Sequence, residues 1–376
     1  MRPKSIFASG LLVAMLLGCE ATEPEMTLDP QLAYVDARDA LLQAAESEDP
    51  VTQAHAMEAM AEVSGKDAGH IFMEGLEAEA PLVRFSAAMA IGDVKYEPAE
   101  EKLAEMARET EPDKRVLSAV IYALHSLGDD SYTSMLARLL FDSEKEVRAN
   151  AAMAMGKIGE PSAIEPLRRV LRDEREISVQ MEIVEAMASL GDERSRHLLE
   201  SYTKTQFMDD RLRGIQALSR VQPARAPEVF ANLTDSRQPP PVRVAAIGGL
   251  AKVAGQTPDS QDYVSQKAYE YCVRALQDPR GILEEAGASP EQIGEMDVQR
   301  LQRLSARSLG WMDRPAAVDV LHPVLKSSEG SIRVAAAMSI LRILEGRVET
   351  PEQPAEADEQ TDPRTQPGLH TAGPRD

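Results

Sequence analysis

The sequence predicts an all-α protein, an α-solenoid in which about nine helix pairs stack into a curved superhelix. One short pattern returns at nearly regular intervals along the 376-residue chain. Within each copy, apolar and small residues follow the 3.6-residue period of a helix, and the period-two alternation of a half-buried strand is absent. Aromatic residues make up 4% of the chain, which disfavours the sheet-rich folds that fill their pleats with aromatic side chains.

Three similar segments, VRFSAAMAIGDV, VRANAAMAMGKI and VRVAAIGGLAKV, fix the register of the repeat; they begin at Val83, Val147 and Val242. The equivalent position recurs nine times, at Thr52, Val83, Val116, Val147, Val179, Asp210, Val242, Leu301 and Ile332. The spacing is 31 to 33 residues except before Leu301, where it is 59. The eighth unit is therefore expected to hold about one extra helix and loop.

Three columns of the aligned repeats confirm this register. The residue seven positions after each anchor is always small: Ala59, Ala90, Ala123, Ala154, Ala186, Ala217, Gly249, Ser308 and Ser339. The residues eight and eleven positions after each anchor are always apolar. These positions share one face of a helix, so each unit is expected to contain an inner helix whose small residues allow close approach of a neighbour.

Partner helices are expected between the inner ones, for example over residues 131–141 and 161–172. Proline stands near the start of several of them, and Gly128, Gly159 and Gly191 follow the helices before them. Proline in the first turn and glycine just past the last turn are typical helix boundaries.

The segment VRANAAMAMGKIGEPSAIEPLRRVLRD, which begins at Val147, resembles the HEAT-like repeats of the bilin-lyase type, and the resemblance covers about residues 30–345. It implies stacked helix pairs whose inner helices line a concave face. Nine pairs at roughly 9 Å per helix layer would form a curved rod about 80 Å long.

The same resemblance implies a structural role for the arginine that follows the anchor in five repeats: Arg84, Arg148, Arg211, Arg243 and Arg333. HEAT families use this arginine in an inter-repeat ladder with an aspartate, and Asp142 precedes Arg148 by the expected six residues. In the other repeats the acid does not keep this spacing, so the ladder is expected to be incomplete.

Residues 1–18 are predicted to be a lipoprotein signal peptide. Arg2 and Lys4 precede an apolar run that is too short to span a membrane, and Leu16-Leu17-Gly18-Cys19 resembles the bacterial lipobox. The resemblance implies cleavage before Cys19 and acylation of that cysteine; the alternative is an ordinary secretory signal with an incidental cysteine. Glu20 stands where aspartate favours inner-membrane retention in enteric bacteria, which favours the outer membrane. The predicted location is the bacterial cell envelope, facing the periplasm.

The remaining domain boundaries follow from composition. Residues 19–29 hold the lipidated cysteine and an acidic tether, residues 30–345 form the solenoid, and the proline-rich and acidic residues 346–376 are expected to be a disordered tail. The formal net charge of −21 argues against a nucleic-acid partner, which would need a concentrated basic face.

The sequence offers no catalytic, metal or cofactor site. The six histidines form no HxxxH pair and have no cysteine partners at metal-binding spacing. Cys272, within AYEYCVRAL, is expected to be a buried structural thiol, and phosphate loops and nucleophile elbows are absent. The protein is therefore expected not to be an enzyme.

Charge segregation supplies the candidate binding site. The outer helices sum to a negative charge and the inner helices to a positive one. The exposed inner edge carries Glu58, Glu62 and Asp93 in the first two units. In the last four units it carries Arg213, Gln216, Arg220, Lys252, Arg307, Trp311 and Arg342. We expect these seven to form a basic concave patch with Trp311 as its anchor. The alternative is a solvated face of mixed charge and a tryptophan that caps the core.

The predicted function is a membrane-anchored, noncatalytic scaffold or adaptor that binds another envelope protein, or an acidic peptide segment of one, through this face. The alternative is an accessory or regulatory subunit of an envelope enzyme, or a lyase-like cofactor chaperone, which would need polar groups converging in a pocket. A polysaccharide binder would need exposed aromatics along the groove, where only Trp311 and Tyr122 qualify. A capping box at Ser289–Gln292 is expected in the stretched eighth unit, with an extra helix beside the basic patch.

Overall fold

The computed structural model describes residues 25–109, 112–254 and 264–348, and every regular element in these ranges is a helix. Each predicted repeat contributes one inner helix. The inner helices are α2 (Pro50–Val63), α4 (Pro81–Val94), α6 (Lys114–Leu127), α8 (Lys145–Ile158), α10 (Ile177–Ser189), α12 (Met208–Val221), α14 (Pro240–Ala254), α17 (Glu295–Gly310) and α19 (Gly330–Leu344). Each contains its predicted anchor residue, which confirms the α-solenoid.

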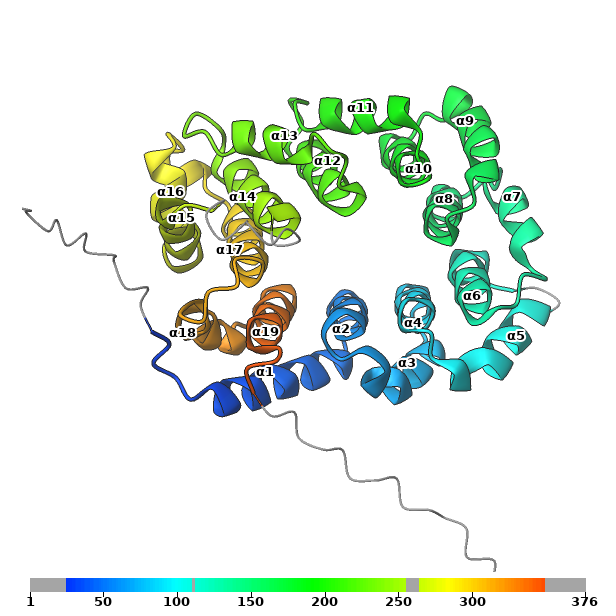
Figure 1. The fold of residues 1–376 in the computed structure, drawn as a ribbon, viewed down its shortest axis with the longest axis horizontal. Coiled ribbons are helices and arrows are strands. Elements are labelled where there is room, and N and C mark those ends of the chain that lie inside the picture. Colours follow the sequence, from blue (N-terminus) through cyan, green and yellow to red (C-terminus); the bar gives the residue numbers. More distant parts are fainter. Residues whose placement is uncertain (1–24, 110–111, 255–263, 349–376) are drawn as a thin grey trace, which may run out of the picture.

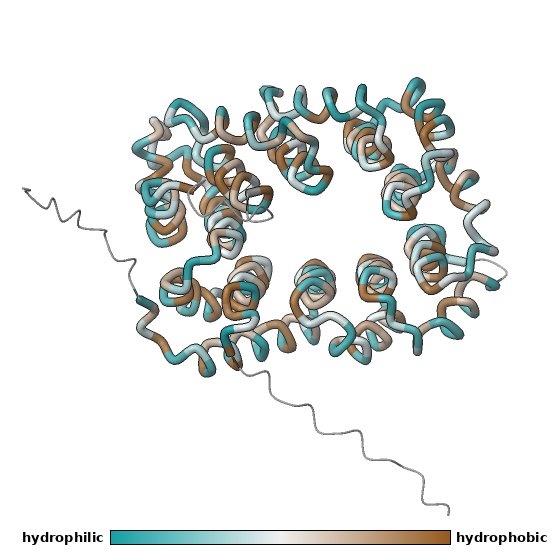
Figure 2. The backbone as a smooth tube through the Cα atoms, viewed as in Figure 1, coloured by the Kyte–Doolittle hydropathy of each residue, from teal (hydrophilic) through white to brown (hydrophobic). Residues whose placement is uncertain are grey.

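The outer layer covers these inner helices (Figure 1). It consists of α1 (Pro30–Ala45), α3 (Gly69–Leu76), α5 (Glu100–Arg108), α7 (Leu136–Leu139), α9 (Ile164–Asp173), α11 (Glu193–Tyr202), α13 (Ala226–Leu233), α15 (Gln266–Gln277), α16 (Pro279–Glu285) and α18 (Ala317–Leu321). Figure 2 shows apolar and polar stretches alternating along these helices, as expected when each helix buries one face.

The solenoid closes into a ring. The first helix, α1, packs against α19 as well as α2, and α19 packs directly against α2 (Figure 1). Polar contacts cross the same junction: the backbone N–H of Thr27 donates to Asp319 at 2.8 Å, and His322 Nε2 lies 2.7 Å from Asp36 Oδ2. The expected open rod about 80 Å long is therefore wrong, because α1 is the outer helix that covers the junction between the last inner helix and the first.

Helix boundaries follow local chemistry. The side chains of Asp29, Asp49 and Asp113 accept hydrogen bonds from backbone N–H groups in the first turns of α1, α2 and α6. Gly128 and Gly159 end α6 and α8 in the left-handed conformation, with φ of 104° and 84°. These glycines satisfy the C-terminal carbonyls at no steric cost, as the sequence predicted.

The column of small residues lies where neighbouring inner helices touch. Ser308 Oγ donates to the carbonyl of Val244 at 3.0 Å, and Ser339 Oγ donates to the carbonyl of Ala306 at 2.9 Å. A Cβ at Gly248 would lie 2.3 Å from Ser308 Oγ, which leaves no room for a larger side chain. Close approach of the inner helices therefore depends on this column.

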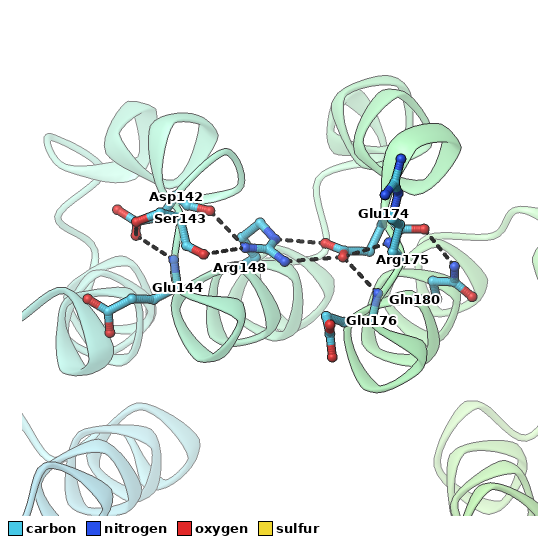
Figure 3. A network of polar contacts seen from close by, with 8 residues as sticks. All are labelled: Asp142, Ser143, Glu144, Arg148, Glu174, Arg175, Glu176 and Gln180. Carbon is cyan, nitrogen blue, oxygen red and sulfur yellow. Dashed lines mark hydrogen bonds and ion pairs between the residues drawn. The ribbon is translucent and has the colours of Figure 1, made fainter.

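The repeated arginines stabilise the loops between repeats, and Arg148 shows how (Figure 3). Its Nη1 donates to the carbonyls of Asp142 and Ser143 at 2.9 and 3.0 Å, and its Nε and Nη2 donate to the Glu174 carboxylate at 2.7 and 3.1 Å. The acid therefore comes from the next repeat. The expected pairing with the Asp142 carboxylate is wrong, because that carboxylate accepts from Lys114 of the preceding repeat at 2.8 Å.

The other repeated arginines vary this arrangement. Arg84 and Arg333 each donate to two carbonyls five and six residues earlier, and Arg84 also pairs with Asp113 at 2.8 Å. Arg211 donates to the carbonyl of Thr203 at 2.8 Å, whereas the Arg243 guanidinium lies 3.8 Å from the centre of the Tyr271 ring. The ladder is incomplete, as expected.

The stretched eighth unit adds its extra helix to the outer layer. Helices α15 and α16 follow one another outside α14 and α17 (Figure 1). The predicted capping box is present, with the backbone N–H of Ser289 donating to Gln292 Oε1 at 3.2 Å. The expectation that the extra helix lies beside the basic patch is wrong, because that patch is on the inner face.

None of the helices in the described part of the chain is long and apolar enough to cross a membrane. The predicted signal peptide, Cys19 and residues 349–376 of the predicted tail lie outside the described residues, as does most of the predicted tether.

Candidate binding site

Four of the predicted site residues occupy one level of the ring. Arg220, Lys252, Trp311 and Arg342 each stand ten positions after the anchor of their repeat, in or just after the last turn of four consecutive inner helices. Equivalent positions of stacked repeats lie side by side. The repeat register therefore gathers these side chains at the end of the inner face where the inner helices finish.

Trp311 is the centre of this group. The Lys252 Nζ lies 4.6 Å from the centre of a Trp311 ring, and the Arg342 Cζ lies 3.7 Å from it. A cation held over an indole face is stabilised by the ring quadrupole, by roughly 0.5–2 kcal/mol depending on solvent exposure. The aromatic ring thus holds both cations in place, and the Arg342 side chain is only 13% exposed there.

Several cations lie close together in this group, and each disfavours the charged form of its neighbours. Desolvation lowers the pKa of Lys252, and the neighbouring Arg342, Arg307 and Arg220 lower it further, against the opposing effect of Glu62. Desolvation and the charge of Arg307 also lower the pKa of Arg342, against the raising effects of Glu62 and Glu345. We call Arg220, Lys252, Arg307, Trp311 and Arg342 the Trp311 cluster.

Two cations of the cluster are ion-paired, and two form no ion pair with the described residues. Arg342 pairs with Glu62 at 2.5 Å, and Arg220 pairs with Glu185 at 2.5 and 2.7 Å. Lys252 and Arg307 form no ion pair with any residue that the structure describes. In addition, Arg342 Nη1 is buried and has no hydrogen-bond partner among those residues. A buried donor without an acceptor costs about 1–3 kcal/mol, and this nitrogen is shielded from a ligand as well as from solvent.

The two remaining predicted residues lie apart from the cluster. Arg213 is exposed in the first half of α12, and Gln216 follows it one turn later. Arg213 acts electrostatically on Glu182 of α10, and no contact joins it or Gln216 to Trp311. The predicted patch of seven residues is thus divided between a five-residue cluster and two separate polar residues.

Acidic residues beside the cluster were only partly found from the sequence. Glu62 was expected at the far end of a rod, and ring closure brings it against Arg342. Glu182 and Glu185 occupy the inner edge of the fifth repeat, three and six positions after its anchor, which is the signal that could have identified them. Desolvation and the nearby Glu185 raise the pKa of Glu182 to about 7, against the lowering effect of Arg220 and Arg213.

A second polar group on the inner face is satisfied internally. Asp93 accepts from Tyr122 at 2.6 Å and from Lys157 at 2.5 and 2.7 Å. Tyr122 is 8% exposed, and burial raises the pKa of its hydroxyl well above the ordinary value, with Asp93 adding to the effect. Tyr122 therefore does not offer the exposed aromatic face that a polysaccharide groove would need.

The described residues contain little that resembles a catalytic site. A hollow of about 400 Å³ is lined by His125, Asp130 and Met155 among others, and one of about 280 Å³ by Arg84, Lys102 and Asp113 among others; neither includes a member of the Trp311 cluster. No group of three or more His, Cys, Asp or Glu side chains in the described ranges could hold a metal ion. Cys272 is fully buried, which raises the pKa of its thiol to about 12.

Comparison with known proteins agrees with this architecture. A sequence family described as HEAT repeats matches residues 38–125, 101–188 and 133–219. No curated protein sequence matches the chain. Among solved structures, the complex of CpcE and CpcF of phycocyanin lyase from Nostoc is similar at 19% identity with a TM-score of 0.39, over 70% of this chain and 97% of that one.

Two further structures show the same distant likeness. Human deoxyhypusine hydroxylase is 16% identical with a TM-score of 0.34, over 84% of this chain and 98% of that one. An engineered protein is 15% identical with a TM-score of 0.18, over 83% and 97% of the two chains. The nine repeats and the helical layers make this chain an α-solenoid, and the family described as HEAT repeats matches its residues 38–219.

Proposed function

We propose that this protein is a noncatalytic adaptor that binds an acidic segment of another protein at the Trp311 cluster. The observation that carries the proposal is the position of Trp311 between Lys252 and Arg342, with the exposed Arg307 acting electrostatically on both cations. A carboxylate is the acceptor that fits this group, because a guanidinium binds planar oxyanions through several N–H donors.

The surroundings favour a short acidic peptide over a long polyanion. Glu62 and Glu185 lie against the cluster, and Glu58 acts electrostatically on Arg220. A short segment needs only the few cations of the cluster, whereas a long polyanion would extend past these carboxylates over a chain whose formal charge is −21. Trp311 adds an apolar contact surface of the kind enriched at the centres of protein interfaces.

We further propose that the ring works in the bacterial envelope, anchored by acyl chains on Cys19, facing the periplasm and held at the outer membrane in preference to the inner one. The basic start, the apolar run and the lipobox-like residues before Cys19 support this location. Thr27 is held to Asp319, so the seven residues between Cys19 and Thr27, which make eight Cα–Cα steps, connect the anchor to the ring. An extended chain of that length reaches about 28 Å at most, which would keep the ring close to the bilayer surface.

Crosslinking and pull-down from membranes test the proposal. The double variant Lys252→Gln with Arg307→Gln should lose the partner captured by the wild type, whereas Arg213→Gln, an exposed arginine of the same inner face, should retain it. The Cys19→Ala variant should move the protein to the soluble fraction. Equal capture by the cluster variant and the wild type would reject the binding site, and an unchanged membrane fraction for Cys19→Ala would reject the anchor.

A further inference from the structure

We infer that the Trp311 cluster also binds an acidic segment of this same chain, residues 349–362, which a partner must displace. The inference rests on the proposed function in one respect, because both use the same cations. It differs in naming the occupant. Residues 349–362 themselves lie outside the described residues, and two observations point to them: the place where the described chain ends, and the charge of the residues that come after that place.

The described chain ends near the loop that follows Trp311. Helix α19 carries Arg342 in its last turn and ends at Leu344. The next residues stay close to the end of α17: Arg347 Nη1 lies 2.8 Å from Asp313 Oδ1, and Asp313 stands two residues after Trp311. The partly buried Val348 packs against the core. Residue 349 therefore starts from the end of the ring at which the Trp311 cluster is found.

The residues that follow Val348 are acidic, whereas the cluster carries positive charge. Residues 349–362 read ETPEQPAEADEQTD, with six acids and no base: Glu349, Glu352, Glu356, Asp358, Glu359 and Asp362. The cluster offers the cations of Lys252 and Arg307, which form no ion pair with the residues that the structure describes. Opposite charges thus belong to the cluster and to the sequence that follows Val348.

Covalent connection makes this contact favourable even when each ion pair is weak. Fourteen residues reach at most about 50 Å when extended, so the acids can meet the cluster without strain. A short covalent connection gives an effective concentration on the order of millimolar. Pro351 and Pro354 limit the conformations open to the segment, which lowers the entropy lost on binding. An external acidic segment must compete with this internal one, so the tail sets a threshold for partner binding.

The sole tryptophan reports directly on the site, because Trp311 is the only one in the chain. The experiment compares the emission spectrum of the mature full-length protein with that of a variant ending at Val348. The probe is a synthetic peptide of residues 349–362, and its control is the same peptide with the six acids replaced by the corresponding amides. Circular dichroism confirms that each protein is folded.

If the inference is right, truncation changes the Trp311 emission, and the acidic peptide restores the full-length spectrum in a saturable, salt-sensitive way. The amide peptide has no effect. The full-length protein needs at least ten-fold more acidic peptide than the truncated protein, because its own tail competes. The double variant Lys252→Gln with Arg307→Gln, in the truncated protein, loses the response, and Arg213→Gln keeps it.

Identical spectra for the full-length and truncated proteins, with no response to the acidic peptide, would overturn the inference. Decaglutamate separates this failure from failure of the proposed function. A truncated protein that responds to decaglutamate but not to the tail peptide refutes the tail as occupant and leaves the acidic-segment site intact. A truncated, folded protein that responds to neither probe refutes both.

Discussion

The Arg342 guanidinium donates to the Glu62 carboxylate at 2.5 Å although the two residues are 280 positions apart in the sequence. Arg342 belongs to the last inner helix and Glu62 to the first, so this ion pair spans the junction that closes the ring. It also joins the acidic end of the repeat array to its basic end. Ring closure therefore sets the charge of the candidate binding site as well as the shape of the molecule.

Replacing Glu62 with glutamine should free Arg342 for a ligand. We expect the affinity for an acidic peptide to rise several-fold, because one internal competitor for the guanidinium is removed. The free energy of unfolding should fall by no more than about 1 kcal/mol, since the Glu62 side chain is 40% exposed. Peptide titration and urea denaturation measure the two effects, and weaker peptide binding by Glu62→Gln would contradict the assignment.

Helix α1 should stabilise the closed ring through its buried face. Leu41 is 1% exposed in α1, and Leu41→Ala should lower the free energy of unfolding by about 2–5 kcal/mol. Leu32, which is 55% exposed on the same helix, supplies the matched control, and Leu32→Ala should change stability by less than about 0.5 kcal/mol. Hydrogen exchange should show faster exchange in α19 for Leu41→Ala only. Equal effects of the two variants would show that α1 does not hold the junction.

Arg148 should matter more to stability than an ordinary surface arginine. Its pairing with Glu174 is largely buried, with side-chain exposures of 15% and 5%. Arg148→Ala would remove the charged partner of that carboxylate, which keeps only the backbone N–H groups of Arg175 and Glu176, and would leave two loop carbonyls without their donor, so we expect a loss of about 3 kcal/mol. The control is Arg172→Ala, at an exposed position of α9, for which a change within about 0.5 kcal/mol is expected. Thermal denaturation of both variants measures the two stability losses, and equal losses would contradict the structural role of Arg148.

Glu182 should make stability depend on pH. Its pKa is raised from the ordinary 4.5 to about 7 in the folded protein, mainly by desolvation. Between these values the folded state binds more protons than the unfolded state, so this group lowers the free energy of unfolding as pH rises from about 4.5 to 7.

Glu182→Gln removes the ionisation and should stabilise the protein at pH 8 by up to about 3 kcal/mol, with little effect at pH 4.5. The comparison is Glu101→Gln, at an exposed position of α5, whose effect should be small at both values. Denaturation at pH 4.5 and 8 checks the difference. A stabilisation by Glu182→Gln that is equal at both pH values would argue against a raised pKa.

The repeat architecture could be predicted because each unit carries its own signals. The small residue seven positions after the anchor and the apolar ones at eight and eleven specify an inner helix, and Gly128 and Gly159 specify where two of them end. Ring closure could not be predicted in this way. Nine pairs in one turn rotate the chain by about 40° per pair on average, and that angle depends on small differences in packing between helices.

The repeat register likewise predicts part of the candidate site but not the part that depends on ring closure. Lys252, Trp311 and Arg342 come together because they share one position in consecutive repeats. Glu62 could be found only once the junction was known, because it approaches from the opposite end of the chain. The acid that pairs with Arg148 was misassigned for a related reason: Glu174 belongs to the next repeat, and spacing within one repeat does not reveal it.

The most direct test of the binding site is calorimetric titration of decaglutamate into the protein truncated after Val348. We predict saturable binding that weakens with added salt, and at least ten-fold weaker binding for Lys252→Gln with Arg307→Gln than for Arg213→Gln. Equal affinity of these two folded variants, or no binding by the truncated protein at low salt, would contradict the assignment of the Trp311 cluster as a site for acidic segments.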